Sequence, residues 1–155
     1  MDEQRITELV QVLEKYELTV AALYDTCASV LPESREAWLV FAAEERLHAQ
    51  WIGALHTHLK GGRISFEQTR FTVQSVQTAI GYIEGQIARI ASGKIDLSQS
   101  LHIAIGIERS LLESAFFRVF NLTGDQALKL RARLVEATRT HLDQLVAWQR
   151  SLGHR

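Results

Sequence analysis

The chain has one cysteine, Cys27, and one proline, Pro32, among its 155 residues. A single cysteine cannot form an intramolecular disulfide, and it excludes zinc or iron centres that are built from several thiolates. With so few prolines there are few forced helix breaks, so the sequence favours long helices.

An excess of charge of either sign is also absent, since 17 basic residues face 18 acidic ones. The basic residues are scattered, whereas a nucleic-acid-binding surface needs a basic stripe, so we expect no nucleic-acid partner. No apolar run reaches the length of a membrane span or a signal-peptide core, so we expect no membrane contact and a cytoplasmic location. The length and the 46% hydrophobic content predict one globular domain over residues 1–155.

Apolar residues recur at intervals of three and four, the spacing of one helical face. Four long helices are expected, over residues 2–30, 32–60, 97–120 and 126–152. Ser65–Gln68 and Asp96–Gln99 have the pattern of a capping box, so a further helix is expected from Ser65 to Ala91. Gly61 and Gly93 supply helix ends on either side of this connecting helix.

The long helices form two tight hairpins, residues 1–60 and 97–152, which a crossover through residues 63–95 joins. This order predicts an all-α fold, a ferritin-like antiparallel four-helix bundle whose long crossover carries an extra helix. A five-helix bundle in another order is the alternative.

Acids and histidines occupy several positions on the apolar stripes where core residues would be expected. They are Glu17, Glu45, His48, Glu108 and His141. Glu17, His48, Glu108 and His141 lie about fifteen to eighteen residues from their hairpin turns, which at about 1.5 Å per residue places them at a similar height. Glu45 lies one turn from His48 on the same face of its helix. A buried carboxylate is unfavourable unless it is paired or bound to a cation. We therefore expect a metal site, and carboxylate with imidazole suits iron, manganese or zinc better than magnesium or calcium.

These residues carry a resemblance to a known family. Leu13–Tyr24, Ala42–Ala49 and Ile105–Glu113 resemble the helix motifs of the rubrerythrin-like branch of the ferritin-like superfamily. In that family each half of the bundle supplies one Glu and one Glu-x-x-His, which together hold two iron ions. The resemblance implies a non-haem iron oxidoreductase that acts on peroxide or oxygen. In the last helix Thr138 stands where the family pattern has a bridging Glu.

The missing acid leaves the number of metal ions open. Three carboxylates and neutral histidines leave one negative charge around one divalent ion, whereas two ions would need an added anion. One or two iron ions are therefore expected, with manganese or zinc as alternatives. A metal-free hydrogen-bonded network, the relic of a lost diiron site, is the competing interpretation.

Three classes of function follow from these alternatives. The first is the metal-binding oxidoreductase, the second is a non-enzymatic helical scaffold or dimerising protein with a vestigial site, and the third is iron storage. Gly81 and Gly85 on the connecting helix permit close packing against a second subunit, so we expect a homodimer. Glu44, Glu113 and Glu136 lie off the apolar stripes and are expected to be solvated, and Tyr24 is the aromatic residue expected nearest the metal.

Overall fold

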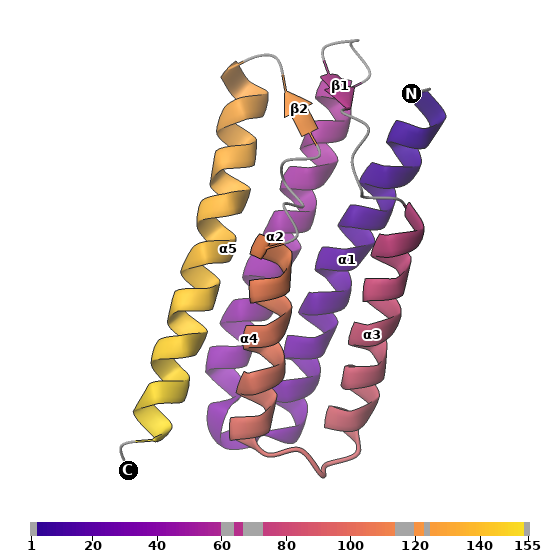
Figure 1. Ribbon diagram of the computed structural model, residues 1–155. Helices are drawn as coiled ribbons and strands as arrows, with labels where there is room; N and C mark the ends of the chain where they lie inside the picture. The colour runs from indigo at the N-terminus through magenta and orange to yellow at the C-terminus, as the bar shows by residue number, and fades with distance from the viewer. Residues whose placement is uncertain (1–2, 60–63, 67–72, 114–119, 123–124, 154–155) are drawn as a thin grey trace.

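In the residues that it describes, the computed structural model has five α helices, one short 3-10 turn and two short strands (Figure 1). It describes residues 3–59, 64–66, 73–113, 120–122 and 125–153. The helices are α1 (Glu3–Val30), α2 (Arg35–Leu59), α3 (Val73–Ala91), α4 (Leu97–Glu113) and α5 (Asp125–Leu152). The strands are β1 (Ile64–Phe66) and β2 (Phe120–Leu122). The predicted helical class is confirmed.

The five helices lie alongside one another, and successive helices run in opposite directions (Figure 1). α1 packs along α2 and α3, while α5 packs against α4 and α2. The two strands pair near the end of the molecule where α2 finishes and α5 begins (Figure 1). Two helical hairpins therefore face each other, and α3 joins them along the outside of α1.

The first hairpin turns at Pro32, which occupies the first turn of the 3-10 segment Pro32–Ser34. Proline suits this position because its fixed backbone angle fits a first helical turn and its missing N–H would have no partner there. The amide of Leu31 donates to the carbonyl of Cys27 at 2.9 Å, and the amide of Ser34 donates to the carbonyl of Leu31 at 3.0 Å. These bonds close α1 and start α2 with almost no loop.

The link between α3 and α4 contains the glycine helix end and the capping box that the sequence predicts. Gly93 adopts a left-handed φ of 75°, and its amide donates to the carbonyl of Ile90. The Asp96 carboxylate accepts from the amide of Gln99 at 2.8 Å, and the Gln99 side chain accepts from the amide of Asp96 at 3.0 Å. The capping box predicted at Asp96 is confirmed, and it fixes the start of α4.

Two predicted helix boundaries are wrong. Ser65, taken as the start of the connecting helix, lies in β1 and pairs with Asn121, and α3 begins at Val73. Phe120, taken as the end of a helix, pairs with Phe66 in the same antiparallel ribbon. The local capping pattern is overridden by the pairing of Ser65 with Asn121, which lies far away in the chain, so the local sequence does not encode it. Gly61, the predicted end of α2, lies outside the described residues.

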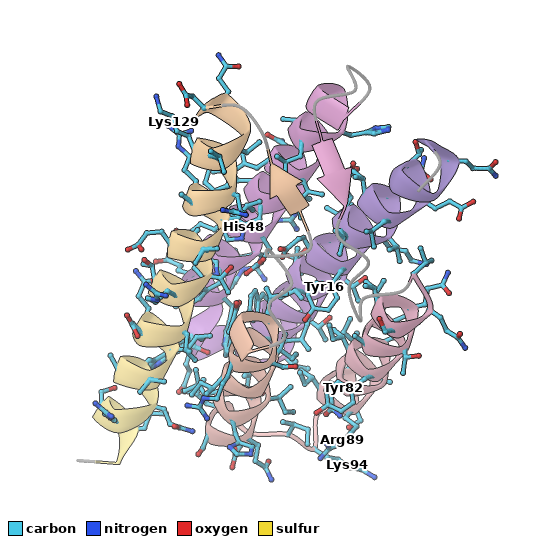
Figure 2. The ribbon with its side chains drawn as sticks, turned by 45° about the horizontal axis from the view of Figure 1, so that its top comes forward. Tyr16, His48, Tyr82, Arg89, Lys94 and Lys129 are labelled. Atoms are coloured by element: carbon cyan, nitrogen blue, oxygen red, sulfur yellow. The ribbon has the colours of Figure 1, made fainter. Side chains whose placement is uncertain are left out.

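The core is continuous from one hairpin to the other. Its largest fully buried side chains come from all five helices: Trp38, Tyr24, Leu13, Leu23, Ile52, Leu55, Ile83, Ile90, Leu101, Leu134 and Leu145. Each such side chain contributes roughly 1.5–3 kcal/mol by leaving water. Tyr82, Arg89 and Lys94 project from α3 and its end on the outside of the molecule (Figure 2). Among the described helices, none is long and apolar enough to cross a membrane.

Candidate metal centre

Polar side chains from four helices are buried within this core. They are Glu17 from α1, Glu45 and His48 from α2, Glu108 from α4, and His141 from α5, each at most 3% exposed. His48 is turned inward from α2 (Figure 2). The hairpin geometry brings these residues to one level because each lies at a similar distance from its turn.

Glu45 joins the two histidines. Its Oε2 lies 3.2 Å from Nδ1 of His48, and its Oε1 lies 2.8 Å from Nδ1 of His141. One ligand atom from each of these three buried residues lies within 4.8 Å of the others. A transition metal sits about 2.0–2.2 Å from its nitrogen and oxygen ligands, so ligand atoms on one ion are at most about 4.4 Å apart. A small closing movement would give all three residues a common ion.

Glu108 completes the α4 side of the cluster. Its Oε1 accepts a hydrogen bond from the Tyr24 hydroxyl at 2.7 Å and lies 3.5 Å from Nδ1 of His141. Burial, together with the Glu108 carboxylate, raises the pKa of Tyr24, so this phenol stays protonated and remains a donor. Tyr24 was expected to be the aromatic residue nearest the metal, and in the structure its hydroxyl contacts one of the predicted ligands.

Glu17 is the least satisfied group in the cluster. Among the described residues, neither of its carboxylate oxygens has a hydrogen-bond partner, although the side chain is fully buried. Burial raises the pKa of Glu17 well above its usual range, and the neighbouring Glu45 raises it further. A carboxylate in this position requires either a proton or a cation.

The carboxylates surround His141 and determine its charge. Burial by itself would lower the pKa of His141, but hydrogen bonding to Glu108 and Glu45 raises it to about 11. The raised pKa favours the imidazolium form of His141 when no metal is bound. Burial lowers the pKa of His48, which leaves that ring neutral and ready to act as a ligand.

The other two acids share these neighbours. Burial and repulsion from Glu108 raise the pKa of Glu45, while hydrogen bonds from His141 and Tyr24 outweigh burial and lower the pKa of Glu108. If a metal ion displaced the proton of His141, it would lie close to the carboxylates of Glu45 and Glu108, which stabilise a positive charge at this point.

Thr138 is buried one helical turn before His141. Its hydroxyl donates to the carbonyl of Leu134 at 2.9 Å, within its own helix. The residue fills the space at this point without adding negative charge.

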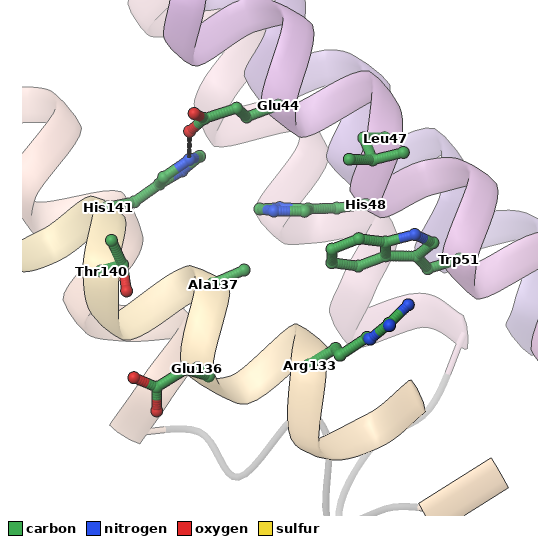
Figure 3. A pocket seen from close by; sticks show the side chains of 9 residues that line it. All are labelled: Glu44, Leu47, His48, Trp51, Arg133, Glu136, Ala137, Thr140 and His141. Atoms are coloured by element: carbon green, nitrogen blue, oxygen red, sulfur yellow. Dashed lines mark hydrogen bonds and ion pairs between the residues drawn. The ribbon is translucent and has the colours of Figure 1, made fainter. Parts of the chain in front are cut away.

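Glu44 was expected to be solvated, and its side chain is 42% exposed. Its contact with the cluster was not expected: its Oε2 contacts Nε2 of His141 (Figure 3). His141 therefore turns Nδ1 toward Glu45 and Glu108 and Nε2 toward Glu44. Metal-binding histidines commonly donate their second N–H to a carboxylate, which fixes the ring and makes the ligand nitrogen more basic.

The remaining acids and one tyrosine are placed as follows. Glu136 is exposed, as expected. The side chain of Glu113 lies outside the described residues. Tyr16, which the apolar stripes do not single out, is buried, and its pKa is raised by burial and, to a smaller extent, by the charge of Glu17. Its position beside Glu17 in the sequence was the available signal.

Comparisons with protein-family models, curated proteins and solved structures give no match for this chain.

Proposed function

We propose that this chain is a ferritin-like metal-binding protein that holds iron, or a similar transition metal, in the core of its helical hairpins. Glu45, His48 and His141 are the primary ligands, and Glu17 and Glu108 are further carboxylates of the same centre. The observation that carries the proposal is the convergence of three buried donor atoms within 4.8 Å. The two hairpins and the long connection through α3 support the ferritin-like assignment.

The donor set fits such a metal. Two imidazoles with carboxylates match iron, manganese or zinc, whereas magnesium and calcium prefer oxygen ligands alone. Glu17 supports the fit because both of its oxygens are buried without a partner among the described residues. A cation would supply the missing positive charge.

The charge of the cluster bears on the number of ions. Glu17, Glu45 and Glu108 carry three negative charges when ionised, so one divalent ion leaves one negative charge, whereas two ions leave one positive charge that needs an added anion. Thr138 contributes a neutral hydroxyl where the rubrerythrin-like pattern has an acid. We infer one tightly held ion, with a second ion requiring an added anion.

Bound iron would supply electron exchange with peroxide or oxygen. Side chains of the protein would orient the ligands of this iron. Glu44 holds the outer nitrogen of His141, and the Tyr24 hydroxyl donates to Glu108 and keeps one oxygen of that carboxylate oriented. The apolar core around the ligands excludes water from the inner side of the centre. A homodimer remains part of this proposal.

A second candidate is a non-enzymatic helical protein whose site has lost its metal. The observation in its favour is that His141 already pairs with Glu45 and Glu44, and Tyr24 with Glu108. A protonated His141 between these carboxylates would supply hydrogen bonds and positive charge to most of the cluster without a metal ion. Only Glu17 is left without a partner among the described cluster residues, and a proton would neutralise it.

Metal content and thermal unfolding separate these two candidates. We expect the purified protein to bind about one iron or zinc ion per chain, since a single ion balances most of the charge. At a metal concentration about a hundredfold above Kd, binding to the native state alone adds about 2.7 kcal/mol of stability, which raises Tm.

The matched variants are His48→Ala, which removes a ligand, and His102→Ala, which removes an exposed histidine on α4. The gain in Tm should vanish in the first and persist in the second. Identical melting curves for metal-loaded and chelator-treated wild-type protein would establish the metal-free candidate instead.

A further inference from the structure

A pocket of about 490 Å³ opens between α2 and α5, directly beside the candidate metal ligands. His48 and His141 form part of its wall (Figure 3). Ligand sites for organic molecules fall in the range of roughly 300–1,000 Å³, whereas a water molecule occupies about 30 Å³. The pocket is therefore far larger than peroxide or oxygen requires.

The walls of the pocket are mainly apolar. α2 contributes Leu47 and Trp51, and α5 contributes Ala137, whose small side chain keeps the space open opposite them. Leu47 is 42% exposed. The Trp51 ring lies 5.4 Å from the His48 ring, so the aromatic wall leads to a candidate ligand. This surface suits the hydrocarbon part of a ligand.

One cation lies on the α5 side of the same pocket. Arg133 is exposed, extends toward Trp51, and forms no ion pair within the part of the chain that the structure describes (Figure 3). Glu44 is held by His141, and the carboxylate of Glu136 is turned away from α2 (Figure 3). The guanidinium is therefore the charged group left to bind a ligand, and its geometry matches a carboxylate.

We propose that this pocket binds a small organic monocarboxylate. Its carboxylate pairs with Arg133, and its apolar body lies against Leu47 and Trp51 with its far end beside His48 and His141. The inference rests on the proposed function in one respect, because a metal at His48 and His141 would lie beside the far end of the bound molecule. Binding itself involves pocket residues and does not need the metal.

Calorimetric titration with octanoate tests the proposal on metal-free and zinc-loaded protein. Octanoate should bind with one site per chain, and octanol, which has the same length without the charge, should bind at least about tenfold more weakly. Arg133→Gln should weaken octanoate binding by a similar factor and leave octanol unaffected. Arg139→Gln, an exposed arginine on α5 that does not line the pocket, is the matched control and should bind as wild type.

Two further variants block the pocket in different ways. Ala137→Trp fills the space, and Leu47→Glu places a negative charge at an exposed position, where folding is tolerant. Either one, with an unchanged circular dichroism spectrum, should abolish octanoate binding. The proposal is overturned if either variant, correctly folded, binds octanoate like wild type, or if octanol binds as tightly as octanoate.

The outcome is separable from that of the metal proposal. Zinc binding without octanoate binding overturns this inference alone. Octanoate binding without zinc binding overturns the metal centre and leaves the carboxylate site established.

Discussion

Glu17 differs from its neighbours because a fully buried carboxyl group has no partner among the described residues. In the metal-free protein its raised pKa means that folding takes up a proton over the pH range where the unfolded chain would ionise it. A cation in the cluster would reverse this preference and favour the ionised acid. The same residue is therefore unfavourable without metal and favourable with it.

Stability as a function of pH should show this in Glu17→Gln. Because the folded pKa is raised, the contribution of Glu17 is fully present below its unfolded pKa and is lost as pH rises toward the folded value. Above about pH 4.5, metal-free wild type should lose stability relative to the variant by up to about 1.4 kcal/mol per pH unit. Urea unfolding between pH 4 and pH 8 measures the difference.

The same variant should be more stable than wild type without metal but should bind zinc more weakly, because it lacks one anionic ligand. If the unfolding free energies of metal-free wild type and Glu17→Gln change in parallel with pH, the Glu17 carboxyl ionises freely in the folded protein, and this argument is wrong.

Thr138→Glu tests the charge argument directly. The substitution creates a second Glu-x-x-His pair with His141 and gives the cluster four carboxylates, the set that holds about two ions in ferritin-like bundles. Iron content per chain should rise above that of wild type, and reaction with peroxide should be faster. Without metal the variant should be less stable, because a fourth acid is buried beside three others. Unchanged iron content with unchanged apo-protein stability would mean that position 138 does not face the centre.

Most residues of the candidate site could be predicted from the sequence, but one of its contacts could not. Periodicity placed Glu17, Glu45 and His141 on inward stripes, and they are buried; their role as ligands stays a prediction. Glu44 was missed because its contact with His141 depends on how closely α2 and α5 approach, a tertiary property that the spacing within one helix does not contain.

Helices and their ends were predictable to different degrees. The long helices follow from apolar spacing, and the start of α4 follows from a reciprocal side-chain cap. The ribbon of β1 and β2 was not predictable, because three-residue strands have too little pattern of their own and each is defined by the other.

Two glycines of the α3 region should respond oppositely to alanine. Gly93 has a φ of 75°, so Gly93→Ala should destabilise by about 1–2 kcal/mol even though nothing obstructs the added carbon. Gly85 lies within α3 with open space around it, so Gly85→Ala should stabilise by roughly 0.5–1 kcal/mol. Thermal unfolding of the two variants measures both effects, and equal shifts would contradict the backbone argument.

Over the whole molecule, the core is one unit that all five helices share. Cys27 lies within it, fully buried on α1. Burial raises the pKa of this thiol to about 12, so almost no thiolate is present at neutral pH in the folded state.

Thiol labelling should therefore report global unfolding. At pH 8 a disulfide reagent should modify Cys27 slowly in native protein and rapidly in urea, and zinc should slow the native reaction further by stabilising the folded state. The time course of absorbance change measures both. Labelling of native protein at the rate of the unfolded chain would show that α1 opens without the rest.

His141 and Glu45 are 96 residues apart, and the two hairpins supply separate halves of the cluster. We therefore expect the full set of donors to come together only after the hairpins have docked. An ion held there would then stabilise the native state and not a transition state that precedes docking. The metal would lengthen the lifetime of the folded chain and leave the speed of its folding unchanged.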